Sequence, residues 1–245
     1  MELHEALGIT QGDVVAFAGA GGKSGAIIAV SEGLLRAGMR VLVAPTTKML
    51  LGEAESIGPL VTSEDSGELY EKAENVLSSS PAVVAGSGML SKNRIGGIDP
   101  AWIGDLARLV DVVLVEADGS RRRPIKGTAD HEPAIPESVT LLVAVGNVSA
   151  LGTPVDEEHV HRPEIFSDLT GVGPGQTITP GAFATAIAQG SLARVPQTSR
   201  TAALITGVEP GRSMSDASVI TRELWRHGVK NVVLASFSPP RVWVP

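Results

Sequence analysis

The chain has 245 residues, of which 43% are hydrophobic and 19% are charged, a composition typical of globular proteins. Its net charge of -7 and its few aromatic residues (four Phe, three Trp and one Tyr) argue against a nucleic-acid-binding protein. The absence of cysteine excludes disulfides, zinc thiolates and thiol catalysis. No basic segment leads into an apolar stretch at the N-terminus, and no apolar run reaches the roughly 18 residues of a membrane span. We therefore expect a soluble cytoplasmic protein that binds neither membranes nor nucleic acid.

Short apolar runs alternate with helical stretches along most of the chain. The runs are nearly continuous, which is typical of strands that are covered on both faces. The predicted strands are residues 14–18, 40–44, 82–85, 111–115, 141–145, 202–205 and 231–235. The predicted helices are residues 23–37, 68–77, 101–109, 180–189 and 215–227. This alternation predicts one α/β domain over residues 1–245, with a mostly parallel sheet, helices on both faces and a loop-rich insertion at about 119–176.

A glycine-rich segment follows the first predicted strand and opens the first long helix. Its glycines allow consecutive backbone N–H groups to curl around an anion, and the helix directs its positive end at the same point. Lys23 would reach the terminal phosphates of a nucleotide, and Ser24 would ligate magnesium. The residues predicted to bind the nucleotide are Gly19, Ala20, Gly21, Gly22, Lys23, Ser24 and Gly25. The motif in this context predicts a P-loop NTPase-like fold that binds Mg2+ and ATP.

This loop differs from the usual Walker A pattern. That pattern places a glycine six residues before the lysine, where this chain has Phe17, and the nearer Gly19 lies four residues before it. The shorter loop resembles that of Mur-type ligases, a P-loop variant that also binds ATP. The alternative is a glycine-rich turn with a solvated lysine, but the buried strand before the loop and the helix after it favour phosphate binding.

Oxygen-bearing side chains follow two of the other predicted strands. Thr46 comes after the second strand, and Glu116 and Asp118 come after the fourth. In such sheets, ligands bind beyond the carboxyl ends of the strands. Thr46 or its neighbour Thr47 could give a hydroxyl to magnesium or to the terminal phosphate; alternatively, the pair of threonines caps the next helix. Asp118 would hold magnesium with Ser24, and Glu116 would either join them or orient the attacking water or substrate; the alternative is a carboxylate that caps a turn.

A run of four cations, Arg121, Arg122, Arg123 and Lys126, comes directly after these carboxylates. Arginine side chains can bind phosphate or carboxylate groups through two parallel hydrogen bonds. They would therefore stabilise a transferring phosphoryl group, the role expected of Arg121, or hold an anionic substrate. The alternative is a solvated charged loop. The catalytic candidates are Lys23, Glu116, Asp118 and Arg121.

Two histidine segments follow the basic run. His131 and Glu132 could perform acid–base work or bind a metal, whereas His161 and Arg162 lie in the second segment. The alternative for both segments is hydrogen bonding within a loop. The substrate-binding candidates are Arg122, Arg123, His131, Glu132, His161 and Arg162. The sequence does not identify the nucleobase of the nucleotide. Residues 206–209 keep only the final carboxylate of the Asn-Lys-x-Asp sequence that guanine-binding proteins use.

The order of these segments resembles the YqeC family of selenium-dependent hydroxylase accessory proteins. The resemblance rests on the glycine loop, Pro-Thr-Thr at 45–47, Gly-Gly-Ile at 96–98, Glu-Ala-Asp-Gly-Ser at 116–120 with the arginines, and the segments of His131 and His161. It covers roughly residues 7–235, and its most specific parts are the Glu-Ala-Asp-Gly and His-Glu-Pro segments. The chain departs from the family at residues 206–209, where many relatives have an Asn-containing segment.

The resemblance implies a role in the maturation of molybdenum hydroxylases that carry selenium, with such a hydroxylase as client. On that basis, we expect a magnesium-dependent ATPase that prepares or inserts a component of the client. A second hypothesis is a non-hydrolytic carrier of a molybdopterin-dinucleotide-type cofactor, whose pyrophosphate would lie in the same loop. A third is a small-molecule kinase or Mur-like ligase, which would release ADP only with an acceptor. Without cysteine, the protein cannot carry selenium on a thiol.

Overall fold

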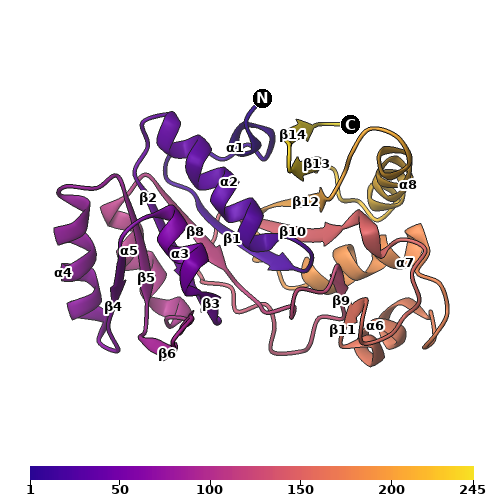
Figure 1. The fold of residues 1–245 in the computed structure, drawn as a ribbon, viewed down its shortest axis with the longest axis horizontal. Coiled ribbons are helices and arrows are strands. Elements are labelled where there is room, and N and C mark those ends of the chain that lie inside the picture. Colours follow the sequence, from indigo (N-terminus) through magenta and orange to yellow (C-terminus); the bar gives the residue numbers. More distant parts are fainter.

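One nine-stranded sheet forms the centre of the fold, which a computed structural model describes for residues 1–245 (Figure 1). The strand order is β14-β13-β12-β10-β1-β8-β2-β5-β4, and every neighbouring pair is parallel except β13 and β14. The strands are β1 (Val14–Gly19), β2 (Val41–Pro45), β4 (Leu60–Thr62), β5 (Ala82–Gly86), β8 (Val112–Glu116), β10 (Leu141–Asn147), β12 (Arg200–Thr206), β13 (Val232–Phe237) and β14 (Pro240–Trp243). The predicted α/β fold with a mostly parallel sheet is confirmed.

All seven predicted strands lie in this sheet, and its two other strands, β4 and β14, were not predicted. β4 has only three residues, which is too short to stand out as an apolar run. β14 is a partly exposed edge strand that carries Pro240 and Arg241, so its sequence resembles a tail. Both strands extend the sheet at its edges and leave the order around β1 unchanged.

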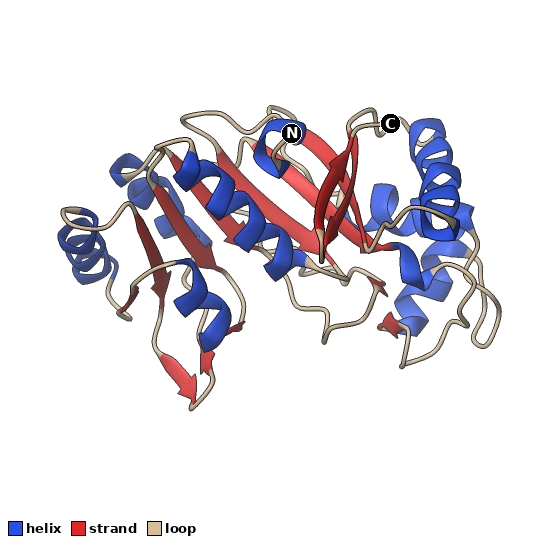
Figure 2. Ribbon diagram, turned by 45° about the horizontal axis from the view of Figure 1, so that its top comes forward, coloured by secondary structure: helices blue, strands red, loops and turns tan.

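Helices cover both faces of the sheet (Figure 2). Val15 and Phe17 of β1 share one buried cluster with Ile27, whereas Ala16 belongs to a second cluster with Phe183 on the opposite face. The helices that contribute to the first cluster are α1 (Leu3–Ala6), α2 (Lys23–Arg36) and α3 (Leu51–Ile57). Those that contribute to the second are α4 (Ser66–Leu77), α5 (Ile103–Leu106), α6 (Pro163–Thr170), α7 (Pro180–Thr185) and α8 (Arg212–Arg226).

The short helices differ most from the sequence-based expectation. The predicted helix at 101–109 is a single α-turn, α5, between 3-10 turns at Pro100–Trp102 and Ala107–Leu109. The helix predicted at 180–189 is α7 followed by a π-helical turn at Ala186–Ser191. Helices α1, α3 and α6 were not predicted, because segments of four to eight residues contain too few turns to show a helical apolar period.

Two small sheets lie near the carboxyl ends of the central strands. One contains β3 (Met49–Leu50), β6 (Met89–Ser91) and β7 (Arg94–Ile95), and the other pairs β9 (Ile125–Lys126) with β11 (Val160–His161). Residues 119–176 contribute the central strand β10, and the segments on either side of β10 form β9, β11 and α6. No helix of the structure combines the length and the apolar character that crossing a membrane requires.

Candidate functional site

The glycine loop joins the end of β1 to the start of α2, and its conformation requires glycine. Gly19 has a φ angle of +97°, and a Cβ atom there would lie 2.3 Å from the carbonyl oxygen of Val145. Gly21 has a φ angle of +74°, and its Cβ atom would lie 2.5 Å from Cβ of Asn147. Both positions combine a left-handed backbone with close contact to β10. The pairing of β1 with β10 therefore explains why these positions are glycine.

The loop presents a row of backbone N–H groups that have no acceptor within the protein. The N–H groups of residues 21 to 25 donate to no backbone or side-chain oxygen, although those of Gly19 and Ala20 are both paired. Thr206 and Asn147 hold the loop in this form, because both side chains donate a hydrogen bond to the carbonyl oxygen of Gly21. The bond from Asn147 Nδ2 measures 3.4 Å. Free N–H groups at the start of a helix are well suited to bind an anion.

The ammonium group of Lys23 is buried beside this loop. Its Nζ donates to the carbonyl oxygen of Gly19 at 2.6 Å and lies 3.1 Å from Oδ1 of Asp118. Asp118 is fully buried, and its Oδ2 accepts a hydrogen bond of 2.9 Å from the N–H of Gly19. Its Oδ1 has no hydrogen-bond partner, so the nearby positive charge of Lys23 compensates it. Two of the catalytic candidates therefore lie in direct contact at the end of β1.

Ser24 and Glu116 bring two oxygen ligands together at the first turn of α2. Ser24 Oγ donates to Glu116 Oε2 at 3.3 Å. Burial raises the pKa of Glu116 to about 7, although the charge of Lys23 opposes this rise. The hydroxyl of Thr46 lies 3.1 Å from the carbonyl oxygen of Ala134 and 3.3 Å from that of Glu116. A hydroxyl and a carboxylate are oxygen ligands of the kind that Mg2+ takes, since this ion uses one or two carboxylates and completes its shell with phosphate and water.

No group of three or more His, Asp or Glu side chains is arranged to hold a metal ion. Ser24 and Glu116 are a pair of oxygen-bearing side chains, fewer than the set that a protein-only metal site needs. Few protein ligands are normal at sites where Mg2+ is bound together with phosphates.

A chain of buried ion pairs extends from Asp118 to the second histidine segment. Lys126 Nζ lies 2.9 Å from Oδ2 of Asp118 and 2.6 Å from Oε2 of Glu132. Arg162 binds both carboxylate oxygens of Glu132, with Nη2 at 3.1 Å from Oε1. Burial favours a higher pKa for Glu132, but hydrogen bonds from Arg162 and Lys126 outweigh it and hold the pKa at about 2. We call Lys23, Asp118, Lys126, Glu132 and Arg162 the ion-pair chain.

His161 lies opposite Lys126 in the β9–β11 pair. Burial lowers the pKa of His161 to about 4, and the positive charges of Lys126, Arg162 and Arg121 add to the effect. Its imidazole is therefore neutral at neutral pH, with a lone pair that can accept a hydrogen bond. His131 is exposed, and its ring makes no hydrogen bond within the protein.

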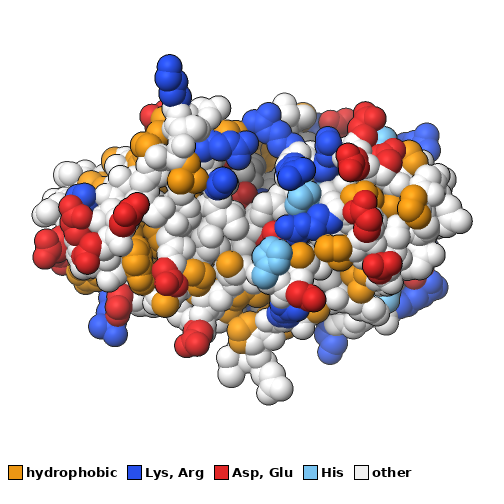
Figure 3. All heavy atoms as spheres, turned by 90° about the horizontal axis from the view of Figure 1, so that it is seen from below, with side chains coloured by type: hydrophobic (Ala, Val, Ile, Leu, Met, Phe, Trp, Pro, Cys, Tyr) orange, Lys and Arg blue, Asp and Glu red, His pale blue; other side chains and the backbone are white.

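The three arginines of the basic run remain free of protein carboxylates. Arg121 and Arg122 are exposed, Arg123 is half-buried, and none of them forms an ion pair. Arg121, Arg122 and Arg162 are the non-glycine residues with positive φ, between +49° and +61°. Such conformations cost free energy and cluster at functional sites. From the side on which β9 and β11 lie, Lys and Arg side chains gather around histidines near the middle of the molecule (Figure 3).

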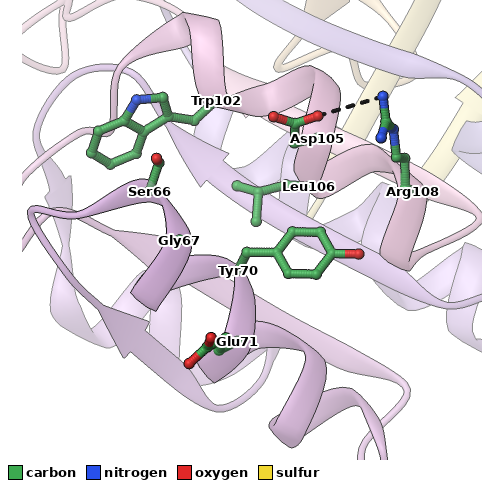
Figure 4. Close-up of a pocket in the computed structure, with 8 residues that line it drawn as sticks. All are labelled: Ser66, Gly67, Tyr70, Glu71, Trp102, Asp105, Leu106 and Arg108. Atoms are coloured by element: carbon green, nitrogen blue, oxygen red, sulfur yellow. Dashed lines mark ion pairs between the residues drawn. The ribbon is translucent and has the colours of Figure 1, made fainter.

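Two pockets of the structure lie outside this group of basic side chains and histidines or at its margin. One, of about 390 Å3, lies between α4 and α5, where Tyr70 and Trp102 line it and Asp105 pairs with Arg108 at 3.6 Å (Figure 4). It contains none of the predicted site residues. The other, of about 350 Å3, includes Glu132 in its wall. The residues of the candidate site lie at the carboxyl ends of β1, β8 and β2, where Lys23, Glu116 and Asp118 are buried.

Known proteins are similar to this chain over the region that contains the candidate site. A family model described as YqeC protein matches residues 15–164, which include every site residue predicted from the sequence. "Uncharacterized protein YqeC" of Escherichia coli (strain K12) is 32% identical over 225 residues, which make up 90% of this chain and 86% of that protein. The chain belongs to the YqeC family. The resemblance inferred from the ordered motifs is thereby confirmed, whereas the printed name of this relative gives no activity.

Three functional candidates of this YqeC-family protein were missed in the sequence. Lys126 lies in the same basic run of the sequence as Arg121, Arg122 and Arg123 and was grouped with them. In the structure, Lys126 differs from these arginines because its side chain is buried and contacts the carboxylates of Asp118 and Glu132. Asn147 and Thr206 fix the carbonyl of Gly21 from the ends of β10 and β12. Their positions in the sequence could have identified them. Asn147 and Thr206 are the polar residues that end apolar strands, and Lys126 follows an apolar residue in a short extended segment.

Proposed function

We propose that this YqeC-family protein is a magnesium-dependent, nucleotide-binding P-loop protein that hydrolyses or transfers a terminal phosphoryl group. ATP is the expected nucleotide. The observation that carries the proposal is the row of free N–H groups at residues 21 to 25, placed beside the buried ammonium group of Lys23. An anion is the natural partner of such a row, since it lies at the positive end of α2.

Each part of the site has a distinct role in this proposal. The loop N–H groups bind phosphate oxygens, and Lys23 turns from Gly19 towards the terminal phosphates. Ser24 and Glu116 supply the protein ligands of Mg2+, with Thr46 next to them. When bound, the cation would neutralise charge that develops on the transferring group. Asp118 is fully buried between two lysines, so we assign it to the positioning of the loop and of Lys23.

The free arginines define the acceptor side of the proposed reaction. Arg121 would bind the transferring phosphoryl group, while Arg122 and Arg123 would hold an anionic second substrate. Neutral His161 would accept a hydrogen bond from that substrate. The absence of protein partners for the three arginines supports this role, because their charge is available for a ligand.

The family resemblance extends the proposal to the maturation of selenium-dependent molybdenum hydroxylases. In this role, a molybdenum cofactor or another anionic component would be the second substrate, and the hydroxylase would be the client. A non-hydrolytic carrier of a dinucleotide-type cofactor would use the same loop for a pyrophosphate. Turnover distinguishes the two, since a carrier binds tightly without releasing inorganic phosphate.

Calorimetric titration of ATP, GTP, CTP and ADP, with and without Mg2+, tests the proposal. We expect magnesium-dependent binding of a triphosphate that falls by about tenfold or more in Lys23→Ala, because charged hydrogen bonds to phosphate are lost. Lys72→Ala is the matched control, since Lys72 forms a surface ion pair with Glu68 on α4. Failure of the wild type to bind any of these nucleotides, or unchanged affinity in Lys23→Ala, would refute the proposal.

A further inference from the structure

Lys126 belongs to the basic run in sequence but to the phosphate site in space. Its side chain is 1% exposed, whereas Arg121 and Arg122 are exposed to solvent. The pairing of β9 with β11 turns it away from the arginines and towards Asp118. Its ammonium group also donates to the carbonyl oxygen of Gly119 at 3.0 Å. A buried lysine with this many acidic and carbonyl partners is fixed in position.

The buried carboxylate of Asp118 needs a second positive partner besides Lys23, and Lys126 provides it. This fully buried carboxylate lies 3.1 Å from Lys23 and 2.9 Å from Lys126. Lys23, however, has a second task, because it must turn towards the phosphates of a bound nucleotide. A buried carboxylate without a partner is strongly unfavourable. If Lys23 were the sole counter-charge of Asp118, the carboxylate would hold it back from the nucleotide.

We propose that Lys126 is a positioning residue of the phosphate site: it keeps Asp118 compensated so that Lys23 can leave it for the nucleotide. The inference rests on the proposed function of the loop. Lys126 can meet this demand because its other carboxylate, Glu132, is also bound by Arg162 through both oxygens. When Lys23 leaves, Lys126 moves its charge towards Asp118, and Glu132 remains paired with Arg162.

This exchange also extends along the ion-pair chain. The charges alternate in sign from Lys23 to Arg162. Loss of the contact between Lys23 and Asp118 therefore strengthens the contact between Asp118 and Lys126. The contact between Lys126 and Glu132 becomes weaker as a result. Glu132 then relies more on Arg162, which becomes less available to an anion outside the chain.

The test compares the affinity of ADP in the absence of Mg2+, which leaves the metal ligands out of the measurement. In Lys126→Met, Asp118 has Lys23 as its remaining lysine, and we expect ADP affinity to fall by about tenfold or more. In the double variant Asp118→Asn with Lys126→Met, the carboxylate charge is gone and Lys23 is released. The asparagine oxygen can still accept from Gly19, and we expect affinity to return to within about threefold of the wild type.

Two controls separate this role from a general effect on folding. Lys72→Met makes the same change on the surface of α4 and should leave ADP affinity unchanged. Lys126→Arg keeps the charge and should retain most of the affinity. If Lys126→Met does not fold, Lys126→Gln decides: it keeps a polar side chain near Asp118 without the charge, and ADP affinity should again fall by about tenfold or more.

Each outcome supports the inference or overturns it. Wild-type affinity in Lys126→Met overturns it, as does a double variant that binds as weakly as the single one, because structural damage would not be relieved by a second substitution. Wild-type affinity in Lys126→Gln also overturns it. Loss of binding in Lys23→Ala together with full binding in Lys126→Met leaves the proposed function intact and removes only this inference.

Discussion

The hydroxyl of Ser24 donates to the carboxylate of Glu116 at 3.3 Å, which joins the first turn of α2 to the end of β8. The register of the sheet produces this contact, because β8 is the neighbour of β1 and Glu116 pairs with Phe17. The candidate magnesium ligands are therefore fixed by two adjacent strands and a helix. Rigid elements of this kind position ligands more accurately than mobile loops do.

Glu116→Gln is predicted to reduce the gain in ATP affinity that Mg2+ provides by about tenfold or more, because an amide is a weak ligand for this hard cation. Glutamine can still contact Ser24, so the loop should keep its shape. The measurement is the ATP affinity with and without Mg2+, and magnesium-free ADP affinity serves as the control. An unchanged magnesium effect would exclude Glu116 as a ligand.

Gly21→Ala tests whether the loop depends on its contact with β10. The new Cβ atom would lie 2.5 Å from Asn147, so the loop must shift and ATP affinity should fall by about tenfold or more. Gly38→Ala is a matched control: Gly38 also has a positive φ angle, +80°, but a Cβ atom there meets nothing within 4 Å. The control should cost about 1 kcal/mol of unfolding free energy and leave ATP affinity unchanged. Equal losses of affinity in both variants would contradict this explanation.

The sequence was informative wherever a signal is local. Continuous apolar runs identified the main strands of the sheet, and Gly-Gly-Lys-Ser between a strand and a helix identified the loop. The sequence could not show that Asn147 and Thr206 hold Gly21, because this depends on the pairing of β1, β10 and β12.

The same limit applies to Lys126. In a run of cations it looks like a fourth surface charge, and only the β9–β11 pair turns it towards Asp118 and Glu132. The contact between Glu132 and Arg162 joins residues that are 30 positions apart in the chain. Sequence reasoning placed both in a substrate site but could not show that they bind each other.

Glu132→Gln is predicted to destabilise the fold by about 2–3 kcal/mol at pH 7, since it removes the carboxylate that Lys126 and Arg162 share. The pKa of Glu132 lies below its ordinary value of 4.5, at about 2, so its stabilising effect is complete above the ordinary value. The effect should fade as the pH drops from about 5 towards about 2, because protonation then removes the charge in the wild type too. Urea unfolding of both proteins across this range provides the measurement, and a constant difference at all pH values would contradict the prediction.

The ion pair between Arg200 and Asp13 allows a test of stability at the amino ends of the central strands, away from the candidate site. Arg200 Nη2 lies 2.6 Å and 2.7 Å from the two carboxylate oxygens of Asp13, just before β1 begins. Burial opposes ionisation of Asp13, but hydrogen bonds from Arg200, Thr140 and Thr10 outweigh it and lower its pKa below the ordinary value of 3.8. Arg200→Ala should cost about 1–2 kcal/mol at pH 7, because half of the arginine side chain is exposed and the pair is partly screened.

The stabilising contribution of Asp13 is present above its ordinary pKa and is lost as the pH falls through the lowered value, so the cost of Arg200→Ala should shrink in acid. The affinity for ATP should not change, because Asp13 and the phosphate loop lie at opposite ends of β1. Unfolding curves and nucleotide titrations of the same variant test both statements. A large change in ATP affinity would show that this amino-end ion pair helps to set the conformation of the loop.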